Sequence, residues 1–132
     1  MNILIVGLGS IGKKHVYAIK SLNLVVKIYA LRSNPNAPIF EDVINIFDID
    51  NIDVKFKFVI ISNPTYLHFE YIKKLALKGI PLFIEKPAIH NLDNIEVLNK
   101  IIEDKKLITY VACNLRFHPC ISFLKDKVQI DQ

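Results

Sequence analysis

Cysteine, glycine and tryptophan are scarce in this sequence of 132 residues, which contains two Cys, four Gly and no Trp. The two cysteines, Cys113 and Cys120, do not have the C-x-x-C spacing that redox and zinc sites use. The sequence therefore predicts two reduced thiols and no metal site. Collagen-like repeats and low-complexity segments are excluded, because only four Gly and six Pro are present.

Long apolar runs are also missing. Hydrophobic residues make up 52% of the chain and the mean hydropathy is +0.30, but Lys, Asn or Asp interrupts the apolar runs. None approaches the roughly 20 residues that a membrane-spanning helix needs. Residues 1–7 lack the features of a secretory leader and predict a strand instead. We expect one compact globular unit, no membrane association and a cytoplasmic location.

The charge of the chain identifies no partner. Seventeen Lys and Arg residues against 13 Asp and Glu give a net charge of +4 and a pI near 9.0. Fifteen of these cations are lysines spread along the chain, whereas nucleic-acid-binding proteins group them in a patch or stripe. We therefore expect no nucleic-acid partner.

Apolar runs and helical periodicity alternate along the sequence. Strands are predicted at residues 2–6, 24–31, 56–62, 80–84 and 107–113, and helices at 11–22, 65–78 and from 91 or 92 to 105. Residues 37–55 are ambiguous: 43–47 fit a short strand, and 48–53 fit a short helix or a turn. This order predicts an α/β fold of the Rossmann type, a doubly wound and mainly parallel sheet with ligands bound at the carboxyl ends of its strands.

A glycine-rich motif follows the first predicted strand. Gly7, Gly9 and Gly12 form G-x-G-x-x-G together with Leu8, Ser10 and Ile11, and the motif opens the first predicted helix. In this context the first glycine permits a tight turn, the second lets a pyrophosphate approach the backbone, and the third permits close packing of helix on strand. Free N–H groups at the helix start bind the phosphates. The motif predicts a dinucleotide site formed by Gly7, Gly9, Ser10, Ile11 and Gly12.

The residues at the end of the second predicted strand indicate which dinucleotide binds. Arg32 lies 20 positions after Gly12, and no carboxylate occurs between Lys27 and Phe40. A carboxylate there would bind the ribose 2′-hydroxyl of NAD, whereas Arg accommodates a 2′-phosphate. Arg32 and Ser33 therefore favour NADP(H), with NAD(H) as the second option. The alternative is that Arg32 is a solvated surface side chain.

Polar residues also follow the later strands. Asn63 and Pro64 follow the strand at 56–62, and Glu85 and Lys86 follow the strand at 80–84. Since carboxyl ends of parallel strands share one edge of a sheet, we expect these residues to line the cofactor site. Lys86 is also the candidate catalytic residue, because its ammonium could bind a substrate oxygen beside the nicotinamide. A plain surface lysine is the alternative.

The histidines and the second arginine give less definite predictions. Arg116 and His118 follow the last predicted strand and are candidates for substrate binding, with an ordinary loop before a helix starting at Pro119 as the alternative. His68 could cap its helix, pack, or approach the nicotinamide, and we include it among the cofactor-binding candidates. For His15, in the first helix, packing is the expected role.

The glycine motif with His15, the segment Asn63–His68 and the tripeptide Glu85-Lys86-Pro87 resemble the amino-terminal domain of the Gfo/Idh/MocA oxidoreductases. The resemblance covers nearly the whole chain. It implies an NAD(P)-dependent oxidoreductase acting on a sugar-like hydroxyl, with Lys86 near the reacting carbon and a cis peptide before Pro87. The segment 116–119 resembles members associated with the synthesis of cell-surface sugars.

The resemblance also predicts how the chain is organised. We expect a dinucleotide-binding Rossmann domain at residues 1–120 and, at 121–132, the start of a connection to an absent carboxyl-terminal domain that supplies the substrate site and a homo-oligomer interface. Because 128–132 lack a capping or turn pattern, we expect a truncated chain that binds cofactor with little or no turnover. Two alternatives remain: a free-standing dinucleotide-binding sensor or regulator, and a structural fragment that binds nothing.

Overall fold

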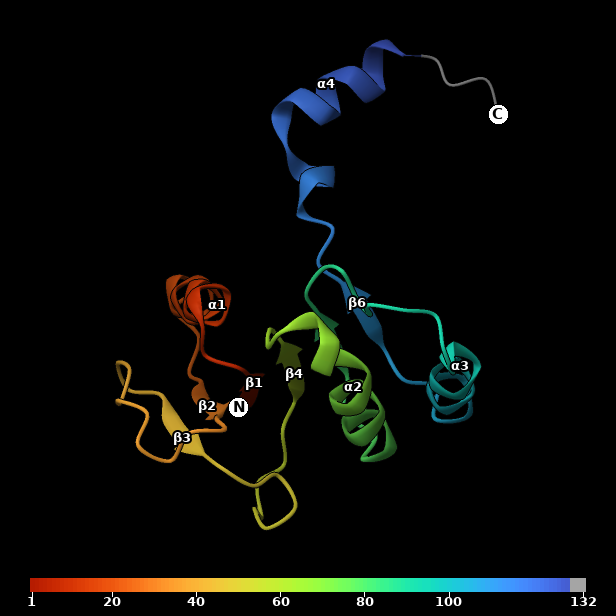
Figure 1. Cartoon of the computed structure of the whole chain (residues 1–132). Helices are drawn as coiled ribbons and strands as arrows, with labels where there is room; N and C mark the ends of the chain where they lie inside the picture. The colour runs from red at the N-terminus through yellow and green to blue at the C-terminus, as the bar shows by residue number, and fades with distance from the viewer. Residues whose placement is uncertain (129–132) are drawn as a thin grey trace.

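The computed structural model, which describes residues 1–128, contains one sheet of six parallel strands (Figure 1). The strand order is β3-β2-β1-β4-β5-β6, the order of a dinucleotide-binding doubly wound fold. The register places Val6 beside both Leu31 and Ile61, so β1 is central. The strands are β1 Asn2–Val6, β2 Lys27–Leu31, β3 Ile44–Ile46, β4 Phe58–Ile61, β5 Leu82–Ile84 and β6 Thr109–Val111. The predicted fold class is confirmed.

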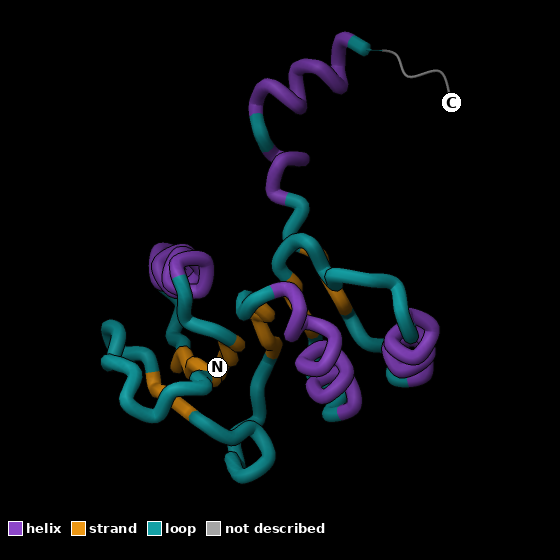
Figure 2. Tube along the Cα trace, viewed as in Figure 1, coloured by secondary structure: helices purple, strands orange, loops and turns teal. Residues whose placement is uncertain are grey.

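Helices cover both faces of the sheet (Figure 2). The α-helices are α1 Ser10–Ser21, α2 His68–Leu77, α3 Ile95–Asp104 and α4 Pro119–Lys127, and the short 3-10 helices are η1 Thr65–Leu67 and η2 Asn114–Phe117. Helix α1 packs on one face, while α2 and α3 pack on the other. In the described part of the chain, no helix is long and apolar enough to cross a membrane.

The core consists of two apolar clusters separated by the sheet. On β1, Ile3 and Ile5 pack toward α1, whereas Leu4 and Val6 pack toward α2, and all four are at most 1% exposed. Burial on both faces explains why β1 reads as a continuous apolar run. Each such side chain contributes about 1.5–3 kcal/mol by leaving water.

The structure differs from the sequence-based boundaries mainly at strand starts. Residues 24–26, 56–57 and 80–81 lie outside strands, because regular pairing begins only where two strands come into register. In the ambiguous region, Ile44–Ile46 is a strand, and 48–53 contains no helix but a bend at 49–51, with the Asp50 amide donating to Asp48 Oδ1 at 2.8 Å. Helix α3 starts at Ile95, later than predicted, after Asn94 in the left-handed conformation with φ of 60°.

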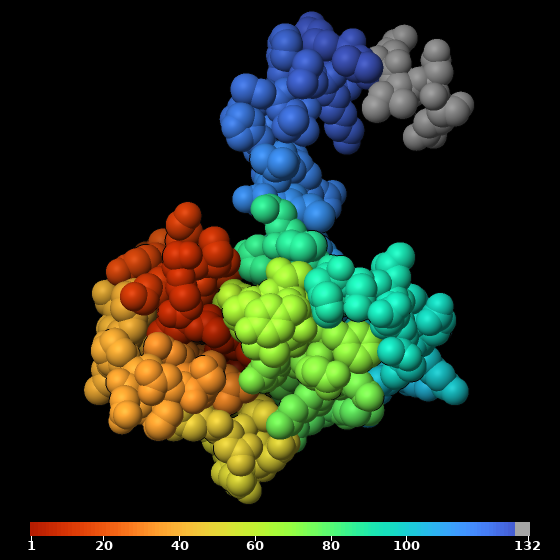
Figure 3. Space-filling model, viewed as in Figure 1, coloured from red at the N-terminus to blue at the C-terminus, as the bar shows by residue number. Residues whose placement is uncertain are grey.

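Residues 113–128, here called the carboxyl-terminal segment, differ from the rest of the described chain. They contain η2 and α4, which starts at Pro119 as predicted, and every residue is exposed. Figure 3 shows this segment in blue, standing away from the body. The last buried residue before it is Ala112, 7% exposed. Residues 129–132, part of the predicted connection, lie outside the described residues.

Candidate functional site

The glycine loop connects β1 with α1 and needs two of its glycines for steric reasons. Gly7 has φ of 83°, and a Cβ there would lie 2.7 Å from Asn63 Cα. A Cβ on Gly12 would lie 2.3 Å from the carbonyl oxygen of Gly7. At Gly9, by contrast, a Cβ would have no described atom within 4 Å, so this glycine leaves open space beside the helix start. That space suits a pyrophosphate bound to the N–H groups of the first turn of α1.

The end of β4 supports the loop from the other side. Ser62 Oγ donates to the carbonyl of Gly7 at 2.8 Å and lies 3.2 Å from the carbonyl oxygen of Val6. The next residue, Asn63, has a buried side-chain amide whose oxygen and nitrogen both lack a partner among the described residues. An unsatisfied buried polar group costs about 1–3 kcal/mol, so this amide is suited to a polar ligand.

Two cavities meet at Asn63 and Pro64. One, of about 280 Å³, lies between the glycine loop and the end of β2, and includes Arg32 and Ser33. The other, of about 250 Å³, extends toward the end of β5. The two cavities together are lined by most of the predicted cofactor residues, which are Gly7, Gly9, Ile11, Arg32, Ser33, Asn63, Pro64, His68, Glu85 and Lys86. Ser10 and Gly12 do not line them; Ser10 is exposed at the start of α1, and Gly12 packs against the loop.

His68 is fixed by two backbone carbonyl groups. Its ring is 1% exposed, with Nε2 at 2.8 Å from the oxygen of Asn63 and Nδ1 at 3.0 Å from the oxygen of Ala88. Both ring nitrogens therefore face protein atoms, and any contact with a cofactor would involve only the carbon edge of the ring. The side chain joins the loop after β4 to the loop after β5, whose Lys86–Pro87 peptide bond is cis.

Lys86 lies where two cavities adjoin. It is exposed and lines both the cavity at Asn63 and a third cavity of about 400 Å³ between α1 and the ends of β5 and β6. Aromatic side chains form much of the third cavity: Phe83 and Tyr110 stack with ring centroids 5.5 Å apart, and Phe117 borders it. An ammonium at this junction can reach a ligand in either cavity.

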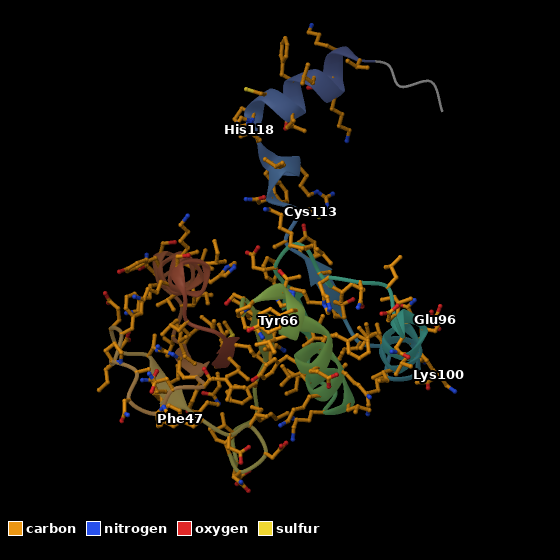
Figure 4. The ribbon with its side chains drawn as sticks, viewed as in Figure 1. Phe47, Tyr66, Glu96, Lys100, Cys113 and His118 are labelled. Atoms are coloured by element: carbon orange, nitrogen blue, oxygen red, sulfur yellow. The ribbon has the colours of Figure 1, made fainter. Side chains whose placement is uncertain are left out.

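Arg116 and His118 are not brought to these cavities. The Arg116 guanidinium lies 5.5 Å from the ring centroid of Phe117, and His118 Nδ1 accepts from the Cys120 amide at 3.2 Å, which caps α4. Figure 4 shows His118 on the segment that stands away from the body. Neither side chain lines a cavity together with Lys86 in the described residues, and their part in substrate binding stays a prediction.

Sequence patterns missed three features of the site. His15, expected to pack, pairs with Glu85, as Nε2 and Oε1 are 2.8 Å apart. Ser62 supports the glycine loop, and Tyr71 lines the cavity beside Arg32. The position of Ser62 at a strand end was an available indication, whereas nothing in the sequence near His15 indicates Glu85.

The sheet is parallel and has the strand order of a dinucleotide-binding fold. One edge carries a glycine loop, an open helix start and an unsatisfied amide. These features together define a dinucleotide-binding Rossmann domain. Residues 1–113 match the model of the oxidoreductase family with an NAD-binding Rossmann fold named GFO_IDH_MocA. The chain belongs to this family, as its motifs predicted.

Individual relatives are distant and longer. Inositol 2-dehydrogenase from Rhizobium meliloti is 26% identical over 120 residues, covering 87% of this chain and 36% of the relative. An uncharacterized protein from Saccharomyces cerevisiae, YMR315W, is 28% identical over 89 residues, covering 67% of this chain and 24% of the relative. The chain thus spans about a quarter to a third of these curated relatives.

Solved structures share the fold. The WlbA dehydrogenase from Chromobacterium violaceum, in complex with NADH and UDP-GlcNAcA, gives a TM-score of 0.84 at 16% identity, over 98% of this chain and 39% of that chain. The apo scyllo-inositol dehydrogenase from Lactobacillus casei gives 0.77 at 23% identity, over 96% and 40%. At these identities the likeness concerns the fold.

Proposed function

We propose that this chain is the dinucleotide-binding part of an NAD(P)-dependent oxidoreductase acting on a hydroxyl or carbonyl group of a sugar or sugar-derived substrate. The observation that carries the proposal is the buried, unsatisfied amide of Asn63 in the wall shared by two cavities. One cavity reaches the glycine loop and Arg32, and the other reaches Lys86. A dinucleotide lying across Asn63 would satisfy the amide and bring its nicotinamide end toward Lys86.

The cavity at the end of β2 supports a preference for NADP(H). Arg32 and Ser33 line it, and Tyr71 provides an aromatic wall near the adenine end. A guanidinium makes charge-assisted hydrogen bonds to phosphate oxygens, each contributing about 1.5–3 kcal/mol. NAD(H) is the second candidate, because the family as a whole is described as NAD-binding.

Lys86 is the candidate catalytic residue. A bound nicotinamide would supply the exchange of a hydride with the substrate carbon. The Lys86 ammonium then holds the substrate oxygen by a hydrogen bond and stabilises negative charge on that oxygen. Asn63 orients the cofactor from the opposite wall, and the His68 ring keeps the loops after β4 and β5 at a fixed separation.

Two relatives support a sugar-like substrate class. Inositol 2-dehydrogenase acts on a cyclic polyol, as its name says, and two WlbA structures hold UDP-GlcNAcA. We propose that the protein containing this chain acts on a sugar-like substrate and has a role in cell-surface carbohydrate synthesis. We also propose that it forms a homo-oligomer and is located in the cytoplasm. Arg116 and His118 are proposed to contact that substrate. We also keep the predicted division into a Rossmann domain at 1–120 and a connection at 121–132.

A paired titration tests the cofactor site. The purified chain is titrated with NADPH and with NADH at fixed salt, and nicotinamide fluorescence is followed. We expect both to bind and NADPH to bind more tightly. Binding of neither cofactor by a chain that circular dichroism shows to be folded would contradict the proposal.

Arg32→Asp tests the cofactor preference. We expect NADPH affinity to fall about ten- to a hundredfold, since a charge-assisted hydrogen bond is replaced by repulsion, while NADH affinity is equal or better. Lys100→Asp makes the same change in charge on α3, away from the cavities, and is the matched control (Figure 4). An unchanged preference in Arg32→Asp would mean that Arg32 is merely solvated.

A further inference from the structure

The carboxylate of Glu85 connects two parts of the site that are distant in sequence. Its Oε1 accepts from His15 Nε2 at 2.8 Å, across 70 positions of sequence, and its Oε2 accepts from the backbone N–H of Lys86 at 3.2 Å. The backbone N–H of Glu85 donates to the carbonyl of Ile61 at 2.9 Å. Three hydrogen bonds therefore fix the backbone from which Lys86 projects.

The His15 ring is held in place from a second direction. It meets Phe83 edge-on, with ring centroids 5.6 Å apart and an interplanar angle of 78°. Phe83 in turn stacks on Tyr110 of β6. The side chains of His15 and Glu85 are each 20% exposed, so most of the surface of the pair is removed from water.

The pair also links the two ends of the proposed cofactor site. His15 lies one helical turn after Ile11, on the same face of α1, and Ile11 borders the cavity that contains Glu85 and Lys86. The start of α1 is the proposed phosphate-binding end, and the end of β5 is the proposed nicotinamide end. The pair thus fixes the separation of these two ends.

We propose that His15 is a positioning residue for the nicotinamide half of the cofactor, acting through Glu85. The inference rests on the proposed function and adds a prediction to it. Ligands that span both ends of the site depend on the pair, whereas ligands that occupy only the end near Arg32 do not. A residue needed merely for folding would affect both kinds of ligand equally.

Two substitutions at His15 separate these cases. His15→Phe keeps a ring against Phe83 and removes the donor to Glu85, whereas His15→Gln restores an N–H donor of similar reach. The probes are NADPH and adenosine 2′,5′-bisphosphate, which lacks the nicotinamide riboside and one phosphate of the pyrophosphate. If the unmodified chain prefers NADH, the probes are NADH and ADP, which lacks only the nicotinamide riboside. Binding is measured by isothermal titration calorimetry, and folding by thermal unfolding.

We expect His15→Phe to weaken NADPH about tenfold and to leave the bisphosphate within about twofold, consistent with the loss of one hydrogen bond to a charged group. His15→Gln retains most of the NADPH affinity. In a Glu85→Ala background, which has no acceptor for His15, His15→Phe costs little more, because the two residues act as one unit. His90→Phe, at an exposed position, is the control.

Three results would overturn the inference while leaving the proposed function intact: unchanged NADPH affinity in His15→Phe, equal weakening of both ligands, or no recovery in His15→Gln. Failure of the unmodified folded chain to bind either dinucleotide would instead remove the proposed function, and the inference with it.

Discussion

The body of the molecule, residues 2–112, and the carboxyl-terminal segment, residues 113–128, are built from similar local structure but differ in packing. In the body, strands and helices enclose two apolar clusters. The segment contains a helix with a proline start and a histidine cap, yet Phe117, Phe123 and Leu124 are 72%, 60% and 52% exposed. An isolated helix of nine residues is marginal in water even when it is capped, because most helix stability comes from packing against a second surface. The body has that second surface, and the described part of the segment does not.

The residues proposed for cofactor binding and those proposed for substrate binding lie in different regions. The body contains the two cavities that meet at Asn63, the unsatisfied amide of that residue, and Lys86. The segment contains Arg116 and His118, whose side chains contact only their own neighbourhood in the described part of the chain. Most of the residues proposed for cofactor binding therefore line adjoining cavities, whereas the two residues proposed for substrate recognition do not line them.

Gly12→Val tests how closely the body is packed, and we expect it to lower stability and cofactor affinity more than the other substitutions. The first added carbon would lie 2.3 Å from the carbonyl oxygen of Gly7, so α1 must move away from β1. We expect a destabilisation of about 1–3 kcal/mol or more and the loss of dinucleotide binding. Thermal and urea unfolding measure the first, and fluorescence titration the second. A variant as stable as the unmodified chain would show that the loop can adjust.

Gly9→Val is the matched substitution at an open position of the same loop. No described atom lies within 4 Å of the added Cβ, and the backbone there is extended, so the melting temperature should stay unchanged. NADPH affinity should fall at least about tenfold, because the side chain would fill the space of the pyrophosphate. If binding persists at full strength, the phosphates do not pass Gly9.

Asp50→Asn tests whether an exposed ion pair of the body contributes as little to stability as the exposed carboxyl-terminal segment. Lys74 and Lys78, at 2.7 and 2.8 Å, lower the pKa of Asp50 from its ordinary value of 3.8. Because the folded-state pKa is lowered, the stabilisation is present above pH 3.8 and is lost as the pH falls through the folded-state value. We expect a small decrease in melting temperature at pH 7 that disappears in acid.

Asp53→Asn, at an exposed position nearby, is the control for Asp50→Asn and should leave the melting temperature unchanged at both pH values. A decrease that persists at a pH well below 3.8 would mean that Asp50 acts through something other than its charge.

Removal of the residues after Asn114 should give the smallest effect. No described residue beyond that point is buried, so the melting temperature and the cofactor affinity of the body should be unchanged. Thermal unfolding and the NADPH titration compare the shortened and original chains. A clear loss of stability would show that the segment packs on the body in solution and would break the comparison drawn above.

Most of the fold could be predicted because its information is local. The apolar run before Gly7, the glycine spacing and the alternation of strands and helices each lie within a short stretch of sequence. Strand starts were predicted less well. Residues 24–26, for example, are apolar but lie outside the strand, since pairing with β1 begins only at Lys27. Strand β3 was ambiguous because only three residues pair at an edge of the sheet.

The candidate site was predictable to the extent that its residues follow strand ends. Arg32, Asn63 and Lys86 were found in this way, and the structure places all three on connected cavities. The contacts of His68 could not be predicted, because both of its ring nitrogens meet backbone carbonyls of loops that the sequence does not place.

The sequence by itself determined the family, the class of fold and the residues at the sheet edge, because each follows from motifs and periodicity within a few neighbouring positions. The tertiary structure alone decided that His15 pairs with Glu85 and that the Asn63 amide is buried without a partner in the described chain. It also decided that Arg116 and His118 do not line the cavities that Lys86 borders. These features depend on which strand ends and helix faces meet, and long-range packing rather than local pattern sets those meetings.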